Sequence, residues 1–247
     1  MRDMLNIIRD RRSMREPFDI GRPIAKPELQ CILEAARWAP TPNNMQNFEV
    51  LVVDDQKQLG AIAAIPAEMS EAFLRENYDQ LSFSDDELQI RKTGMLARMF
   101  PAAWTDPEAW SPDSDYTSQL SFLGKFMQPA PLLLIVVYDS NKRAPGSDRD
   151  IVGHLSLGCV LENMWLESES LGIGLQVLTV FSNGQVENRL KRLLGIPGHL
   201  KIAFACRLGY PTAPSPKEPH VRRDIEDFVH HNHFGRKEIV WSGSHHG

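Results

Sequence analysis

The chain has 247 residues, of which 42% are hydrophobic and 24% are charged. This is ordinary globular composition, and it excludes a disordered, collagen-like or low-complexity protein. The 27 Lys and Arg against 32 Asp and Glu give a net charge of −5. That balance argues against a bulk nucleic-acid binder, because such proteins usually carry a basic surplus.

Cysteine usage and hydropathy add two expectations. The three cysteines are far apart and form no C-x-x-C or Cys/His ligand spacing, so a structural zinc site is not expected. Their small, odd number fits a reducing compartment. The longest apolar run, residues 130–138, is too short to cross a bilayer, and the first residues lack the apolar core of a signal peptide. We therefore expect a soluble, cytoplasmic protein with no membrane, nucleic-acid or metal partner.

The N-terminal part of the chain predicts two helices and a strand. Apolar spacing predicts a short helix over 4–11 with its apolar side chains inward, and a second helix over 28–38 with Pro27 in its first turn. Pro40 ends the second helix, because the residue before a proline is pushed out of the α region. A β-branched run over 48–53 then predicts a buried strand.

The middle of the chain has a different character. Helices are predicted over 56–64 and 86–99, and three prolines interrupt the residues after the second of them. A long, partly irregular excursion inside a compact domain is typical of a lid or a binding loop. We therefore expect an inserted lid over about 55–128.

Regular patterning returns after residue 129. A wholly apolar run predicts a buried strand, and a long amphipathic pattern that ends at Gly172 predicts a helix. The predicted elements are a strand over 131–138, a helix over 151–171, a strand over 175–181, a helix over 186–194 and a strand over 202–208.

These strands and helices alternate without the strict rhythm of parallel βαβ units. The sequence has no G-x-G-x-x-G after a strand, no G-x-x-x-x-G-K-[ST] and no G-x-S-x-G. Their absence argues against a dinucleotide-binding Rossmann fold, a P-loop ATPase and an α/β-hydrolase. The predicted fold class is α+β.

A basic cluster comes directly after the first predicted helix. Residues 11–15, which we name the arginine segment, place Arg11, Arg12 and Arg15 around Ser13. Guanidinium groups bind phosphate in bidentate fashion, and the serine hydroxyl adds a donor. On spacing alone, a solvated basic helix end is the simpler interpretation.

A polar loop joins the second predicted helix to the first strand. In residues 40–47, which we name the amide loop, Asn44 and Gln46 offer amide donors and acceptors suited to the polar edge of a heterocycle. The alternative is an ordinary turn rich in turn-forming residues. Near the C-terminus, His230, His231 and His233 lack the i, i+4 geometry of a helical metal site, so no metal is expected there.

Taken in chain order, these segments carry a resemblance. R-R-S-x-R, A-P-T-x-x-N-x-Q-x-F before a strand, L-G-I-G after the long helix, G-Y-P and a late R-R-D-I-E-D-F-V-H occur in that order. The set resembles the nitroreductase family of FMN-dependent oxidoreductases over about residues 4–54 and 129–235. The resemblance implies an α+β sandwich whose central, mostly antiparallel sheet is flanked by helices. It also implies an intertwined homodimer with two FMN sites at its interface.

The resemblance further implies a domain arrangement and a reaction. It places a single FMN-binding domain over 1–235, with the lid inserted at about 55–128 and a C-terminal tail over 236–247. NADH or NADPH would donate hydride to flavin N5, and a small flat acceptor, a nitroaromatic or a quinone, would then be reduced in a ping-pong cycle. The chemistry takes place on the flavin, so no catalytic side chain is expected.

Family positions that contact FMN can be carried over one by one. The positions are Arg11, Arg12, Ser13 and Arg15 at the phosphate and flavin ring, Pro40, Thr41, Asn44 and Gln46 in a loop from the partner subunit, Val177, Leu178 and Thr179 along the isoalloxazine, and Arg222 or Arg223 at the phosphate. Arg15 is the candidate cation near flavin N1. The chain departs from the family at Asn47-Phe48, where Pro-Trp is frequent, and at Thr41, where Ser is frequent.

The predicted lid is rich in aromatic residues, which stack on flat acceptors. Its candidate substrate contacts are Tyr78, Trp104, Trp110 and Tyr116.

Two alternatives to a nitroreductase activity remain. Flavin-dependent reductive dehalogenases that resemble iodotyrosine deiodinase share R-R-S-x-R and grip an amino-acid zwitterion with a lid Glu, Tyr and Lys. This chain has Glu71, Glu76, Tyr78 and Lys125 in that region, although the Glu-to-Tyr spacing differs. The second alternative is a non-catalytic flavin-binding module, which would hold FMN without oxidising NAD(P)H.

Overall fold

The structure is a computed structural model that describes residues 3–67, 78–97, 129–182, 184–213 and 221–237. The chain divides into two compact units. The first comprises 1–68 and 119–216, and the second comprises 69–118 and 217–247.

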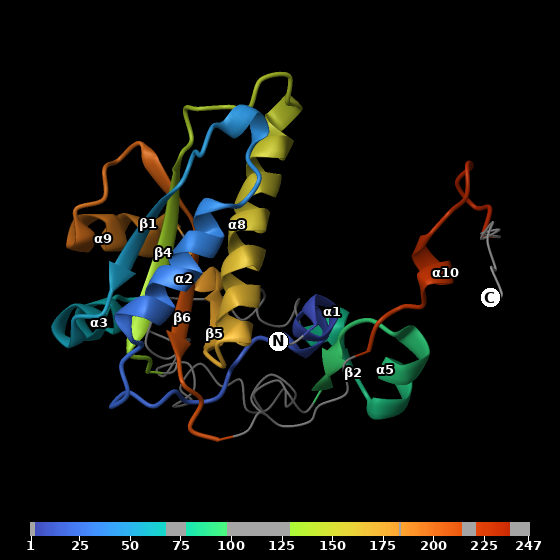
Figure 1. Cartoon of the computed structure of the whole chain (residues 1–247), viewed down its shortest axis with the longest axis horizontal. Helices are drawn as coiled ribbons and strands as arrows, with labels where there is room; N and C mark the ends of the chain where they lie inside the picture. Colours follow the sequence, from blue (N-terminus) through green and yellow to red (C-terminus); the bar gives the residue numbers. More distant parts are fainter. Residues whose placement is uncertain (1–2, 68–77, 98–128, 183, 214–220, 238–247) are drawn as a thin grey trace. The chain divides into compact units, whose positions relative to one another are not determined.

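A four-stranded sheet forms the centre of the first unit (Figure 1). Its strand order is β1-β4-β6-β5, and each neighbouring pair is antiparallel. The predicted α+β class with an antiparallel central sheet is therefore confirmed. The strands are β1 (Glu49–Val53), β4 (Leu132–Asp139), β5 (Gly174–Leu178) and β6 (Leu200–Gly209).

Helices cover both faces of this sheet. In Figure 1 the sheet lies between α8 (Ile151–Ser170) on one side and α3 (Gln56–Ala63) and α9 (Gly184–Leu194) on the other. Helix α2 (Lys26–Arg37) packs against α8, and the Asn163 side-chain amide of α8 donates to the carbonyl of Ala35 at 3.0 Å.

Strand β4 is buried on both faces, as its uninterrupted apolar run predicts. Leu132, Leu134 and Val136 belong to the core that α2 and α8 cover, together with Ile32, Val160 and Met164. The alternate residues Leu133, Ile135 and Val137 are also fully buried. Successive side chains of a strand point to opposite faces, so these residues lie toward the other helical layer.

Three expectations about the first unit are corrected. Helix α1 (Met4–Asp10) has no buried residue, although its apolar side chains were expected to point inward. Strand β1 is only partly buried because it lies at the edge of the sheet. The strand expected over 175–181 ends at Leu178, and the chain continues as the 3-10 turn η6 (Thr179–Ser182).

The second unit contains short elements. Helix α5 (Asp85–Arg91) follows β2 (Ser82–Phe83), which pairs in parallel with β3 (Met95–Leu96), and α10 (Ile225–Phe228) lies in its C-terminal part. The helix expected over 86–99 ends early because Lys92 adopts the left-handed conformation, with φ of 54°. Gly94, with φ of 90°, then turns the chain into β3. Among the described residues, no helix is long and apolar enough to span a membrane.

Candidate functional site

The arginine segment lies along the edge strand of the sheet. Ser13 forms a parallel bridge with Leu175 of β5, and the Met14 amide donates to the Leu175 carbonyl at 2.9 Å. Strand β5 is the last strand of the sheet, so this contact adds a short stretch of chain to an edge that no other strand of the described residues covers. Two segments that are far apart in sequence, and that sequence analysis selects independently, are therefore neighbours in space.

The same edge carries backbone groups of the next predicted site residue. The Leu175 carbonyl points away from β6, because it accepts from Met14. Backbone groups alternate in direction along an antiparallel strand, so the N–H and C=O of Val177 point to this edge as well. Val177 is half-buried and Leu178 is buried. The edge of β5 thus presents backbone donors and acceptors next to the backbone of the arginine segment.

Helix α8 holds the first arginine of the segment. The Arg11 guanidinium lies over the ring of Trp165 at 4.3 Å, and its Nε is 3.5 Å from a carboxylate oxygen of Glu162. The Trp165 indole N–H donates to the carbonyl of Arg12 at 3.2 Å. These contacts fix the orientation of a long side chain that would otherwise sample many rotamers.

Two glycines make room for the turn after the arginine segment. Gly174 and Gly209 are paired in the register of β5 and β6. A methyl group on Gly174 would lie 2.6 Å from a ring carbon of Phe18 and 2.9 Å from Met14 Cγ, and one on Gly209 would lie 2.6 Å from Phe18 Cβ. Gly174 in the L-G-I-G motif therefore leaves room for the side chains of Phe18 and Met14.

The amide loop is strained and internally bonded. Asn43, Asn44 and Gln46 all have positive φ, between 45° and 55°. The Thr41 hydroxyl oxygen accepts from the Gln46 amide N–H at 3.1 Å, and the Gln46 side chain donates to Asn44 Oδ1 at 3.0 Å. Non-glycine residues with positive φ are costly and concentrate at functional sites. The loop thus holds two exposed amide side chains in one arrangement.

Asn47 fastens the end of this loop to the sheet. Its Nδ2 donates to the Asp139 carbonyl at 3.0 Å, and its Oδ1 accepts from the Asp139 N–H at 3.1 Å. Glu49 pairs with Val137 in the antiparallel β1–β4 register, so position 47 lies opposite Asp139. The Asn47 side chain supplies these bonds in place of its backbone. This explains structurally one departure from the family pattern.

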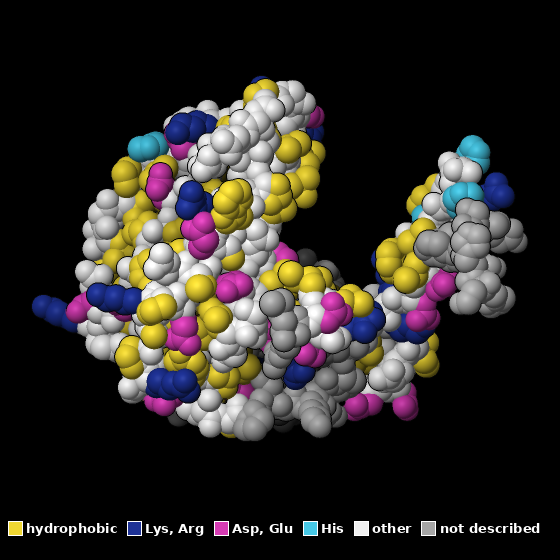
Figure 2. All heavy atoms as spheres, viewed as in Figure 1, with side chains coloured by type: hydrophobic (Ala, Val, Ile, Leu, Met, Phe, Trp, Pro, Cys, Tyr) yellow, Lys and Arg dark blue, Asp and Glu magenta, His cyan; other side chains and the backbone are white. Residues whose placement is uncertain are grey.

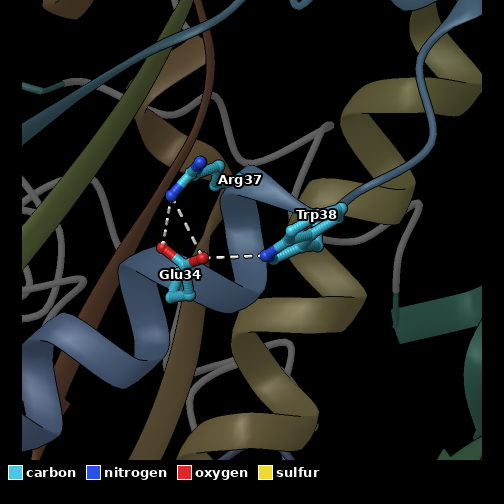
Figure 3. Close-up of polar contacts among 3 residues, drawn as sticks. All are labelled: Glu34, Arg37 and Trp38. Atoms are coloured by element: carbon cyan, nitrogen blue, oxygen red, sulfur yellow. Dashed lines mark hydrogen bonds and ion pairs between the residues drawn. The ribbon is translucent and has the colours of Figure 1, made fainter.

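The helix that leads into the amide loop ends in a polar network (Figure 3). The Trp38 indole N–H donates to Glu34 Oε1 at 2.8 Å, and the Arg37 guanidinium bonds both carboxylate oxygens of Glu34 at 3.1 and 3.2 Å. Trp38 nevertheless remains 74% exposed. A large ring held rigidly in an exposed position, next to the loop, is available for contact with another molecule.

Within one chain, the amide loop and the arginine segment contact different parts of α8. The turn η1 (Pro42–Asn44) packs near the start of α8, where Pro42 and Gly153 line one pocket. The arginine segment packs near Glu162 and Trp165. The two contact points are roughly 14–18 Å apart along the helix axis, at 1.5 Å per residue.

Arg222, Arg223 and Tyr78 belong to the second unit, and the other predicted lid positions lie outside the described residues. Arg222 donates to the carbonyl of Val221 at 2.7 Å, and the Arg223 guanidinium lies 5.5 Å from the Phe228 ring centre. Tyr78 is half-buried. Among the described residues, no group of His, Cys, Asp or Glu could hold a metal ion. The positions outside the described residues are Trp104, Trp110, Tyr116, Glu71, Glu76 and Lys125.

The roles of three residues that build this site were not predicted from the sequence. Trp165 and Glu162 are read as part of an amphipathic helix, and Asn47 as a loop residue. Arg207 of β6, which is fully buried, is also missed. The sequence does contain a signal for Arg207, because it is the single charged residue inside the apolar run 202–208 and departs from the pattern of a buried strand.

Comparisons with known proteins agree with this fold. The model of the nitroreductase family matches residues 8–210. An iodotyrosine deiodinase of Thermotoga neapolitana is 28% identical over 197 residues, which are 78% of this chain and 83% of that protein. A nitroreductase of Bacteroides fragilis, solved with bound FMN, has a TM-score of 0.54 at 20% identity and covers 90% of this chain and 96% of its own. An iodotyrosine deiodinase bound to FMN and 3-iodo-L-tyrosine has a TM-score of 0.59 at 22% identity, covering 94% of this chain and 100% of its own.

Proposed function

Because the chain belongs to the nitroreductase family, we propose that it binds FMN and acts as an NAD(P)H oxidoreductase on flat aromatic acceptors such as nitroaromatics or quinones. The observation that carries the proposal is the position of the arginine segment along the open edge of β5. The bound FMN in the Bacteroides fragilis nitroreductase supports the choice of cofactor.

The residues at this edge fit the two chemical parts of FMN. Arg11, Arg12 and Arg15 supply guanidinium groups within five residues, which suit a phosphate that carries nearly two negative charges. The outward N–H and C=O of Val177 suit the polar edge of a flavin ring.

FMN supplies the redox chemistry when it is bound. The protein side chains bind and orient. Arg15 would place a positive charge beside the ring and so favour its anionic reduced form, while Trp165 and Glu162 keep Arg11 in place. No side chain has to act as a nucleophile.

A homodimer completes the proposed site. Ile151, Val152 and Leu155 of α8 are 58%, 44% and 63% exposed, and Figure 2 shows hydrophobic side chains gathered on the outer side of this helix. A helix that is apolar on more than one face needs a second covering surface. A second copy packed there would bring its amide loop to the arginine segment of the first copy. Within a single chain these two segments lie apart.

This assembly has a direct test in solution. Leu155→Glu should convert the dimer to a monomer in light scattering and weaken FMN binding, because a charge on the covered face opposes association. Leu193→Glu, on the exposed side of α9, is the matched control and should remain dimeric. If the wild-type protein binds FMN as a monomer, the proposal that two copies share one FMN site is contradicted.

Reductive dehalogenation is a second candidate, favoured by one observation. The match to the Thermotoga neapolitana iodotyrosine deiodinase spans 78% of this chain. Halide release from 3-iodotyrosine, measured with a chemical or nicotinamide reductant, tests this activity. NAD(P)H consumption with a nitroaromatic and without halide release supports the first proposal.

The first experiment is the visible spectrum of the purified protein, followed by NADH or NADPH without oxygen. Flavin bands that bleach on addition of the nicotinamide support the oxidoreductase. Bound flavin that stays oxidised with both nucleotides indicates a flavin-binding module, and a colourless protein that takes up no added FMN refutes the proposal.

Arg15→Gln should weaken FMN binding about 10- to 100-fold, the worth of a charge-assisted hydrogen bond. Arg192→Gln, an exposed cation on α9, should leave binding unchanged.

A further inference from the structure

A buried arginine lies behind the arginine segment. Arg207 is in β6 and is 0% exposed, and it pairs with Gln176 of β5 on one side and Leu133 of β4 on the other. Charged side chains are almost never fully buried unless they are paired. Its presence in the middle of the sheet therefore requires compensating contacts.

Those contacts come mostly from the stretch that continues the arginine segment. Arg207 Nη2 donates to the carbonyl oxygens of Met14 at 3.0 Å and Glu16 at 2.9 Å. Its Nε donates to the Gln176 side-chain oxygen at 2.5 Å, and its guanidinium lies over the Phe18 ring at 4.3 Å. The guanidinium thus links residues 14–18 to β5, the two segments whose contact forms the proposed site.

Burial of this charged side chain inside the sheet has a cost. Burial lowers the pKa of Arg207 to about 10, although the Glu16 carboxylate raises it, so the side chain is charged at neutral pH while removed from water. Its Nη1 is buried and has no hydrogen-bond partner among the described residues. An apolar residue would fill the same strand position without these costs. It would lack the pair of bonds to residues 14 and 16.

We propose that Arg207 is a positioning residue for the cofactor, which holds the backbone of residues 14–16 so that the guanidinium groups of the arginine segment and the edge of β5 face the same bound FMN. This rests on the proposed FMN binding. Arg207 acts through the backbone of the segment and is not itself a contact of the flavin. Its loss should therefore change cofactor affinity and local order more than global stability.

The test combines hydrogen exchange of the FMN-free protein with FMN titration. In Arg207→Met, the Met14 amide, which donates to Leu175, should exchange at least tenfold faster relative to β4 amides, because its neighbouring carbonyls lose their anchor. FMN affinity should fall at least tenfold. Lysine has a single ammonium group and lacks the several N–H donors of the guanidinium, so Arg207→Lys should give intermediate values in both measurements.

A second buried cation provides the matched control. Lys191 of α9 is 8% exposed and pairs with Glu187 at 3.0 Å, away from both proposed FMN segments in sequence. Lys191→Met should lower stability but leave the relative exchange of Met14 and the FMN affinity within twofold of wild type.

Three results would overturn the proposal. Exchange and affinity both within twofold of wild type in Arg207→Met would do so, as would faster exchange with unchanged affinity, since the bonds would then serve stability alone. If Arg207→Met does not fold, wild-type values for Arg207→Lys would do so. A wild-type protein that takes up no FMN refutes the proposed function instead, and exchange still reports whether Arg207 holds the segment.

Discussion

Replacement of Asn47 by alanine should destabilise the protein by about 2 kcal/mol. The side chain makes two hydrogen bonds to the backbone of Asp139, at 3.0 and 3.1 Å, and alanine can make neither. Each such bond contributes about 1 kcal/mol net. For a chain of this size, the loss corresponds to a fall in melting temperature of roughly 4–8 °C.

Urea unfolding followed by circular dichroism measures this effect. Asn141→Ala is the control, because Asn141 is exposed in the loop after β4 and its replacement should change stability by no more than about 0.5 kcal/mol. The Asn47 variant should also bind FMN more weakly, because the amide loop loses its attachment to the sheet. A change in the free energy of unfolding below about 0.5 kcal/mol for Asn47→Ala would refute the argument that this side chain replaces a strand pair.

Three further predictions concern packing, thiol reactivity and pH. Gly174→Ala should cost about 1–3 kcal/mol in urea unfolding, because the added methyl would lie 2.6 Å from a buried ring carbon, whereas Gly60→Ala, with open space and a helical position, should stabilise slightly. Burial raises the pKa of the Cys206 thiol, so a thiol reagent should label exposed Cys31 in the folded protein and leave Cys206 unreacted until urea is added. Burial alone raises the pKa of Glu187, but a lysine ammonium and a backbone N–H outweigh it and lower the pKa. The contribution of ionised Glu187 to the free energy of unfolding is therefore complete above the pKa of this carboxyl in the unfolded state. It is lost as pH falls through the lower pKa of the folded state. The stability advantage of wild type over Glu187→Gln should shrink below about pH 4.5, and a constant difference between pH 7 and pH 3.5 would contradict it.

Local patterns predicted most of the regular elements of the first unit. The apolar run of β4 and the periodicity of α8 are visible without any tertiary information, because the spacing of apolar residues reports the geometry of their own segment. The arginine segment and the amide loop were also selected from the sequence, through the ordered set of motifs that carries the family resemblance, because each segment by itself is compatible with an ordinary helix end or turn. Whether they form one FMN site stays a prediction.

Local patterns left open which surface covers each apolar face and which segment lies beside each strand. The apolar spacing of helix α1 predicted side chains packed in the core, but the helix has no buried residue. The apolar, β-branched residues of β1 predicted a buried strand, but β1 lies at a sheet edge. Asn47 and Arg207 act through partners 92 and about 190 residues away in sequence.

The sequence alone was sufficient for the fold class, because helix and strand periodicity are local properties, and the family resemblance selected the two segments that carry the proposed chemistry. Tertiary structure was needed to place the arginine segment against β5, to give Asn47 and Arg207 their partners, and to separate the amide loop from the arginine segment within one chain. Each of these depends on strand order and register, which are set by contacts between residues distant in the chain.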